Sequence, residues 1–233
     1  NKNQIIDFVS YQQVKGEFKD PKFNVVIKKG TPKFKKKFNG KVFSLVQGAS
    51  GNNNYFHWMF DILPRLIILE KFYNLNDINF FYCPQIKPWQ LSTLSIFNIG
   101  NDKLINSNLH RHIQADKILA VSHPWYSKGL ILNEAKNLPS WIINEIAFKF
   151  EKYGKKFECN DKIFIDRSDS LFSHCQIINS DEVWEFLKNE GFTKIRSTEI
   201  TFKNQIGLFN SASTIVGAHG AGLTNMIFSK SNT

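Results

Sequence analysis

Two stretches of the chain carry residue types whose spacing could support chemistry, and one lies near the C-terminus. A β-branched run there leads into a loop that holds one histidine among small residues: His219, Gly220, Ala221 and Gly222. Glycines let main-chain N–H groups come close to a ligand, and a helix expected over residues 223–228 would add its N-terminal donors. The pattern predicts a phosphate-binding or diphosphate-binding loop, in which Thr224 and Asn225 either cap the helix or touch the ligand. A tight turn with a partly buried histidine is the alternative.

The second stretch is a helix expected over residues 53–72, which carries a row of polar residues on an otherwise apolar surface. Asn53, His57, Asp61 and Arg65 recur at every fourth position, so the row turns by only about 40° per step. Buried titratable groups are costly unless paired, so the row must face a polar cleft or its own partners. We predict a general base here, either His57, which titrates nearest neutral pH, or Asp61, which would need a raised pKa. The alternative is an Asp61–Arg65 ion pair, with His57 capping a main-chain group.

Three neighbouring residues bear on the shape and surface of this helix. Pro64 removes the main-chain hydrogen bond to Phe60, so it should kink the helix or end it beside Asp61. Tyr55 and Trp58 belong either to the core or to a platform on which the ring of a ligand stacks.

The elements that must position these residues follow from hydrophobic periodicity and from turn residues. Strands are expected at residues 42–46, 78–83, 115–121, 162–166, 192–196 and 213–217. Further helices are expected at residues 88–98, 139–153, 180–190 and 202–210. From residue 162 onward the order is βαβαβ, which implies a parallel sheet.

Ligands of open α/β sheets bind at the carboxyl ends of the strands. Arg167 follows the strand at 162–166, and the glycine loop follows the strand at 213–217. We therefore expect Arg167 and this loop to converge on one diphosphate, although a salt bridge from Arg167 to Asp166 or Asp169 is the alternative. No Asp-x-Asp pair stands at a strand end, so no metal site is predicted, and arginine, imidazole and main-chain donors must neutralise the diphosphate.

The two stretches together resemble glycosyltransferase family 61. The similarity is carried by Asn54-Tyr-Phe-His-Trp58, Leu63-Pro-Arg-Leu66 and His219-Gly-Ala-Gly-Leu-Thr-Asn225, with ordered matches between them such as Ile163-Phe-Ile-Asp-Arg-Ser168. It extends from about Val42 to the end of the chain. His174 stands where the family has an arginine shortly after its Arg-Ser pair.

The resemblance implies a GT-B-like α/β fold, with two Rossmann-like domains built on parallel sheets. It also implies an inverting, metal-independent glycosyltransferase that needs no cofactor and takes a nucleotide sugar, expected to be UDP-linked, as its donor. The acceptor would be a glycan or a lipid-linked hydroxyl. His57 and Asp61 would be the catalytic residues, and the residues expected to bind substrate are Arg65, Arg167, His219, Gly220, Ala221, Gly222, Thr224 and Asn225.

The charge balance favours an anionic partner. The net charge is +10, and the densest basic run is Lys33-Phe-Lys-Lys-Lys-Phe38. Such a run suits a diphosphate, a nucleic acid or peripheral contact with anionic lipids, but also a solvated edge strand. No nucleic-acid-binding motif accompanies it, so no nucleic-acid partner is predicted. A basic nucleic-acid-binding protein and a non-catalytic nucleotide-binding module are the rival interpretations.

Length and composition suit an α/β protein with a substantial core. We expect an acceptor-side domain over 1–138, a linking helix over 139–157 and a nucleotide-sugar-binding domain over 158–233, incomplete because the chain stops soon after the glycine loop. Cys83, Cys159 and Cys175 have no metal-ligand spacing and are expected to be small buried residues. The resemblance implies either bacterial surface-polysaccharide synthesis or eukaryotic glycosylation in the Golgi or ER lumen. The richness in Lys, Asn, Ile and Phe, with unpaired cysteines, favours the bacterial alternative, a cytoplasmic enzyme peripheral to the inner membrane.

Overall fold

The computed structural model describes residues 6, 9–10, 12–14, 17–25, 28, 34–46, 54–125, 138–168 and 175–233. The chain forms two compact units. The first comprises Asn1–Asn53 and His57–Ile142, and the second comprises Asn54–Phe56 and Ile143–Thr233. The domain limits expected from the sequence stay a prediction.

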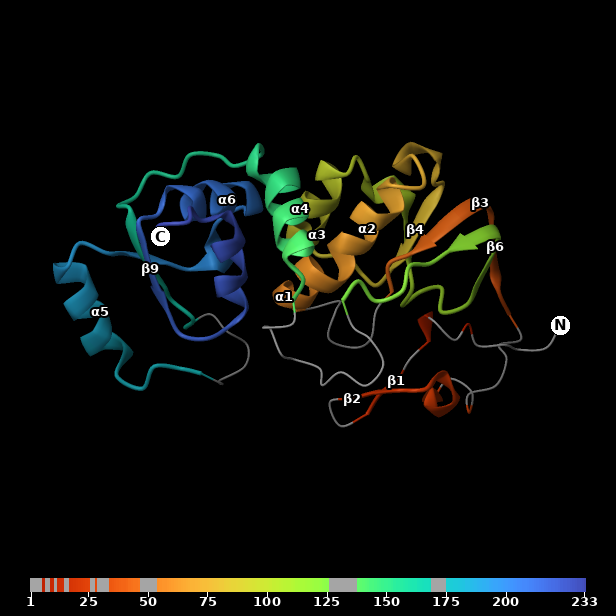
Figure 1. Cartoon of the computed structure of the whole chain (residues 1–233), viewed down its shortest axis with the longest axis horizontal. Helices are drawn as coiled ribbons and strands as arrows, with labels where there is room; N and C mark the ends of the chain where they lie inside the picture. Colours follow the sequence, from red (N-terminus) through yellow and green to blue (C-terminus); the bar gives the residue numbers. More distant parts are fainter. Residues whose placement is uncertain are drawn as a thin grey trace. The chain divides into compact units, whose positions relative to one another are not determined.

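The first unit contains a parallel sheet in the order β5-β4-β3-β6. Its strands are β3 (Lys36–Ser44), β4 (Phe80–Cys83), β5 (Leu104–Asn106) and β6 (Ile113–Leu119), of which β3 and β6 run side by side in Figure 1. Two short strands near the N-terminus, β1 (Gln12–Val14) and β2 (Glu17–Lys19), form an antiparallel pair.

Apolar side chains explain the helical part of this unit. A helical path runs from α1 (Tyr55–His57) through a π-helical turn (Trp58–Ile62) into α2 (Leu63–Glu70), and α3 (Pro88–Ile96) follows β4. Trp58 and Leu66 are fully buried, as are Phe81 on β4 and Phe43 on β3. Together these side chains form the hydrophobic core of the unit.

The basic run lies at the beginning of β3, which is a central strand of the sheet. Lys36 and Lys37 pair with β6, whereas the pairing of β3 with β4 covers only Val42–Ser44. The register with β6 shifts between Phe38 and Lys41, where Gly40 has a φ of 89° and donates its N–H to Asp116 Oδ2 at 2.6 Å. The described part of the basic run thus pairs with β6 alone and is exposed, as the edge-strand alternative expected, although β3 is a central strand further along.

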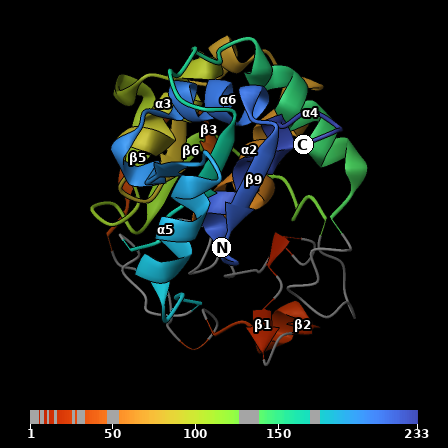
Figure 2. The ribbon, with the colours of Figure 1, turned by 90° about the vertical axis from the view of Figure 1, so that its left-hand side faces the viewer.

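The second unit contains a parallel sheet in the order β8-β7-β9. Its strands are β7 (Lys162–Ile165), β8 (Thr193–Ile195) and β9 (Thr214–Gly217). Its helices are α5 (Ser180–Asn189), α6 (Phe202–Ser211) and a 3-10 helix (Ala221–Phe228), while α4 (Ser140–Glu151) begins in the first unit and continues into the second. The two crossovers run in opposite directions with the same hand, so α5 and α6 lie on opposite sides of the sheet (Figures 1 and 2).

Most expected elements are confirmed to within a few residues, and the α/β class with parallel sheets is confirmed. β5 was not expected, because it is only three residues long, and β3 begins earlier than expected. Cys83 is buried, which raises the pKa of its thiol to about 12, whereas Cys175 is exposed, contrary to expectation. In the part of the chain that the structure describes, none of the helices has the length and apolar character needed to span a bilayer.

Candidate functional site

The helical segment that carries His57 and Asp61 has a widened backbone. The π-helical turn spans Trp58–Ile62, and the N–H of Leu63 donates to the carbonyl of Trp58, five residues earlier. Pro64, which has no N–H to donate, lies in the first turn of α2. The chain stays helical to Glu70, so the helix does not end beside Asp61. Turns of this kind occur frequently at functional sites.

Asp61 is the centre of a hydrogen-bonded cluster within the first unit. Its Oδ2 lies 2.7 Å from Nδ1 of His57, and its Oδ1 accepts a hydrogen bond from Nε1 of Trp125 at 2.9 Å. Nε2 of His123 lies 3.5 Å from the same Oδ1. We call His57, Asp61, His123 and Trp125 the carboxylate cluster.

The surroundings of Asp61 keep its carboxylate ionised. Burial by itself would raise the pKa of Asp61, but hydrogen bonds and charge from His123 and His57 outweigh it, so the pKa lies below its ordinary value. From the sequence, Asp61 could act as the base only with a raised pKa. In the structure its pKa is lowered instead. The side chain of His57 is 17% exposed and that of Asp61 3%, so the histidine is the more accessible of the two.

His123 faces Asp61 with the nitrogen that carries its proton. Its Nδ1 accepts a hydrogen bond from the main-chain N–H of Trp125 at 3.3 Å, which assigns the proton of the neutral ring to Nε2. Burial lowers the pKa of His123, Asp61 opposes that shift, and Arg65 and His57 add to it. A neutral His123 thus presents an N–H to the Asp61 carboxylate.

The sequence interpretation missed His123 and Trp125, although one feature pointed to them. They lie a few residues after the end of β6, and polar or aromatic residues beyond the carboxyl end of a parallel strand commonly belong to sites. Asn53, by contrast, lies outside the described residues.

Arg65 is buried at 4% exposure and bonds to main-chain carbonyls. Its guanidinium donates to the oxygen of Val121 at 2.9 Å and to that of Val46 at 3.3 Å, just beyond the ends of β6 and β3. Burial lowers the pKa of Arg65 to about 10, and the charge of Asp61 opposes this shift. Arg65 forms no ion pair with Asp61 within 4.0 Å among the described contacts, so the ion-pair alternative is wrong. Its expected contact with substrate stays a prediction.

Trp58, on the same helical path as Arg65, lies in the core of the first unit. Its side chain is fully buried, packs edge-on against Trp89 and donates its Nε1–H to Thr93 Oγ1 at 2.9 Å. Trp58 therefore belongs to the core, and stacking on a sugar ring is excluded for it in this structure.

The carboxyl edge of the sheet in the second unit brings Arg167 to the glycine loop, as the topology predicted. β7 and β9 are paired in parallel, and the guanidinium of Arg167 donates to the main-chain oxygen of His219. A Cβ on Gly220 would collide with this guanidinium, so only glycine leaves room for it there. The side chain of Asp169, one of the alternative partners of Arg167, lies outside the described residues, as does His174.

Arg196 at the end of β8 is a further basic group on this edge, which the sequence interpretation missed. Its Nε donates to Asp166 Oδ2 at 3.0 Å, and Asp166 also accepts from the N–H and the hydroxyl of Ser168. Burial would raise the pKa of Asp166, but these hydrogen bonds and Arg196 hold it below its ordinary value. The salt bridge expected as an alternative for Arg167 is therefore made by Arg196 instead.

The residues after the glycine loop are fixed by a buried network. Asn225 is 1% exposed, donates to Gln205 Oε1 at 2.6 Å and accepts from the hydroxyl of Tyr55 at 2.5 Å. Gln205 in turn donates to the carbonyls of Ser197 and Ile200. Burial raises the pKa of the Tyr55 hydroxyl, and its bond to Asn225 opposes that shift. The phenol of Tyr55 thus stays protonated as a donor.

The expected helix after the loop is a 3-10 helix that begins at Ala221. Its N-cap is Gly220 and its C-cap is Ser229, so neither Thr224 nor Asn225 caps it. Both are buried, and the hydroxyl of Thr224 has no hydrogen-bond partner among the described residues. Their expected contacts with the nucleotide, like those of His219, Ala221 and Gly222, stay predictions.

Across the described residues, no group of three or more His, Cys, Asp or Glu side chains is arranged to hold a metal ion. The chain matches the family model described as Glycosyltransferase 61 over residues 55–233. That range holds both the carboxylate cluster and the glycine loop. No curated protein matches the chain.

Proposed function

We propose that this chain, which belongs to the glycosyltransferase 61 family, transfers a sugar from a nucleotide-sugar donor to an acceptor hydroxyl with inversion at the anomeric carbon. The observation that carries this proposal is the pairing of a partly exposed His57 with a buried, ionised Asp61 at 2.7 Å. A histidine that a carboxylate orients and holds in one tautomer is a common form of general base.

His57 removes the proton of the acceptor hydroxyl. With its Nδ1–H donated to Asp61, the neutral imidazole carries its lone pair on Nε2, which takes the proton as the acceptor oxygen bonds to the anomeric carbon. The bond from that carbon to the diphosphate oxygen breaks on the opposite face, and the nucleoside diphosphate leaves. Asp61 stabilises the imidazolium that forms, which is why a lowered pKa for Asp61 suits a positioning role better than that of the base.

The carboxyl edge of the second sheet receives the diphosphate. Arg167 uses one N–H on His219 and keeps further donors of its guanidinium for phosphate oxygens. The main-chain N–H groups of the glycine loop add donors beside it, and Arg196, whose charge is shared with Asp166 and Glu199, keeps one further N–H group on this edge. The leaving group is neutralised by these groups, so transfer needs no metal ion in this proposal.

Finer features belong to the same proposal. The donor is UDP-linked, the acceptor is a glycan or lipid-linked hydroxyl, and the chain adopts a GT-B arrangement of two Rossmann-like domains. The proposal also includes peripheral contact of the protein with a membrane, at the cytoplasmic face of an inner membrane. These features derive from the family resemblance and the basic composition.

The first experiment measures thermal stabilisation of the protein by UDP-, GDP- and CMP-sugars, with and without EDTA. We expect one nucleotide class to raise the melting temperature in EDTA, with the effect lost in Arg167→Ala and kept in the matched control Arg111→Ala. Loss of stabilisation on adding EDTA would contradict the metal-free mechanism. Equal stabilisation by a dinucleotide would favour a non-catalytic nucleotide-binding module.

A second experiment separates binding from chemistry. His57→Ala should keep the donor-induced stabilisation while release of nucleoside diphosphate in the presence of acceptor falls by about 100-fold or more. His112→Ala, at an exposed histidine of the same unit, is the control. Unchanged turnover in His57→Ala would exclude it as the base.

A further inference from the structure

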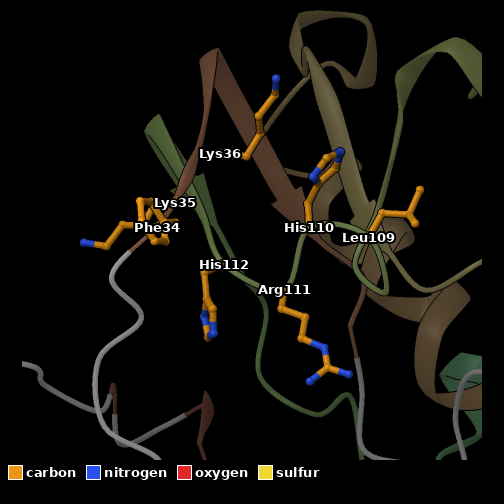
Figure 3. Close-up of a pocket in the computed structure, with 7 residues that line it drawn as sticks. All are labelled: Phe34, Lys35, Lys36, Leu109, His110, Arg111 and His112. Atoms are coloured by element: carbon orange, nitrogen blue, oxygen red, sulfur yellow. The ribbon is translucent and has the colours of Figure 1, made fainter.

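A hollow lies at the beginning of the first sheet, away from the carboxylate cluster. It has a volume of about 430 Å³ and lies where β3 begins and where the chain enters β6 (Figure 3). Its lining consists of Phe34, Lys35, Lys36, Leu109, His110, Arg111 and His112, which we call the basic hollow. A second hollow of about 210 Å³ shares Leu109 and His110 with it and is otherwise lined mainly by apolar residues of the strands.

The main chain around the basic hollow is held in place. The N–H of Lys36 donates to the carbonyl of His112 at 3.1 Å, and the hydroxyl of Tyr82 donates to the carbonyls of His110 and Arg111 at 2.7 and 3.0 Å. The Phe38 ring packs edge-on against His110. The chain on both sides of the hollow is thus fixed to the sheet.

Positive charge dominates the lining. Lys35, Lys36 and Arg111 are exposed, and no Asp or Glu lines the hollow. None of these three side chains forms an ion pair with a carboxylate in the described part of the chain. The nearby carboxylate of Asp116 accepts the N–H of Gly40. Among the described residues no carboxylate balances this charge, so an anion from outside the chain would complement this surface.

Two large apolar side chains stand out beside these charges. Phe34 is 90% exposed and Leu109 76%. Figure 3 shows the basic side chains pointing to several sides of the hollow, with Phe34 on one side and Leu109 on the other, so they do not converge on one small ion. A broad surface that combines cations with exposed apolar groups matches a lipid–water interface, where anionic headgroups attract Lys and Arg and apolar side chains enter the acyl boundary.

We propose that the basic hollow binds the anionic headgroups of a phospholipid membrane, with Phe34 and Leu109 inserted beside them. This surface is independent of the transfer reaction, because it contains none of the residues assigned to the acceptor or the donor. A nucleic-acid duplex would use the charges alone. A single strand could also stack bases on Phe34, but Leu109 offers no ring for stacking and favours the membrane.

The test is co-sedimentation with vesicles of phosphatidylcholine alone or with about 30% phosphatidylglycerol. The first variant, Lys35→Glu/Lys36→Glu/Arg111→Glu, reverses three charges, and the second, Phe34→Ser/Leu109→Ser, removes the apolar groups. The matched control, Lys152→Glu/Lys188→Glu/Lys230→Glu, reverses three exposed lysines of the second unit. Melting temperatures of all variants establish that they fold, and single Lys35→Glu and Arg111→Glu variants replace the triple if it does not.

Wild type should bind the phosphatidylglycerol vesicles, with binding weakened by salt. The charge variant should lose about tenfold or more in affinity, the apolar variant several-fold, and the control less than about twofold. An equal loss in the control would show that net charge alone is responsible and would overturn the site. Unchanged binding of the apolar variant, with an oligonucleotide duplex binding as tightly as the vesicles, would assign the surface to polyanions instead. Either outcome would remove the peripheral membrane contact from the proposed function, but neither affects the proposed transfer reaction, because vesicle binding and turnover are measured separately.

Discussion

At the scale of single residues, the chemistry of this protein depends on how one carboxylate is surrounded. Asp61 is buried beneath His57, Trp125 donates to its Oδ1, and His123 presents Nε2 to the same oxygen. Two imidazoles that favour the ionised carboxylate outweigh the cost of burying it. The consequence is a carboxylate that holds His57 in one orientation and leaves proton transfer to the ring.

Asp61→Asn should impair catalysis more than binding. The amide can accept from His57 but carries no charge to stabilise the imidazolium, so kcat should fall by about 100-fold or more, with the donor KM little changed. Steady-state kinetics check this, with Asp116→Asn as the control, and a variant that lost only donor affinity would contradict it.

His123 should make the stability of the protein depend on pH. Its pKa in the folded state lies below the ordinary 6.5 because it is buried, so below about pH 6.5 the unfolded chain binds more protons than the folded one. Stability should therefore fall as the pH drops from about 7 toward 5. The lowered pKa of Asp61 also makes the protein less stable as the pH falls, but this effect acts at lower pH, near and below 3.8.

In His123→Gln, stability should depend less on pH between 7 and 5. The difference in slope from the wild type should be about that of one titrating group. Melting temperatures of the variant and of the exposed control His112→Gln measure it. An unchanged slope in His123→Gln would assign the pH dependence to other groups, of which His57, Asp61 and Arg65 face His123 most closely.

At the scale of elements, the ends of parallel strands bring distant residues together. The loop after β9 lies against Arg167 from the end of β7, and Gly220 leaves space for the guanidinium. Arg196 from the end of β8 reaches the same edge through Asp166. Three parallel strands thus bring two arginines and the glycine loop to one edge of the sheet, and Arg167 contacts the loop from 52 residues away in the sequence.

Gly220→Ala tests this arrangement. The added methyl would occupy the position of the Arg167 guanidinium, which can move because it is the end of a flexible side chain. We expect an increase of about tenfold in the donor KM, since a charge-assisted contact is displaced, with little loss of stability. Gly217→Ala is the matched control, because its methyl would meet Ile165 Cβ at 3.2 Å and Leu223 Cδ2 at 3.3 Å rather than Arg167. Equal effects of both variants on KM would refute the role of the guanidinium.

At the scale of the whole molecule, the chain is divided between two compact units, and it passes from one to the other more than once. Asn54–Phe56 belongs to the second unit although the residues that follow belong to the first. The hydroxyl of Tyr55 donates to Asn225, which lies 170 residues later in the sequence. This bond fixes a segment of the N-terminal half to the 3-10 helix that follows the glycine loop.

Tyr55→Phe should lower the free energy of unfolding by about 1–3 kcal/mol, because Asn225 Oδ1 would lose its donor while staying buried. Urea unfolding measures this. Tyr73→Phe is the control, since its hydroxyl contacts only the exposed Lys117 and should change stability by less than about 0.5 kcal/mol. Equal effects would mean that the Tyr55–Asn225 bond contributes nothing specific.

The sequence by itself determined the family, the α/β class and the position of most helices and strands. These depend on local properties: apolar periodicity, turn residues and motifs such as His219 to Asn225. It also determined that Arg167 and the glycine loop share one edge, because a βαβαβ order leaves parallel strands with their carboxyl ends together.

Tertiary structure alone decided which groups surround each of these residues. His123 and Trp125 contact Asp61 although they lie 62 and 64 residues later in the sequence. Arg65 donates to the carbonyls of Val46 and Val121 and not to Asp61. Whether a carboxylate has a raised or a lowered pKa depends on the balance between burial and such partners. That balance is set by contacts between distant segments, which no local pattern encodes.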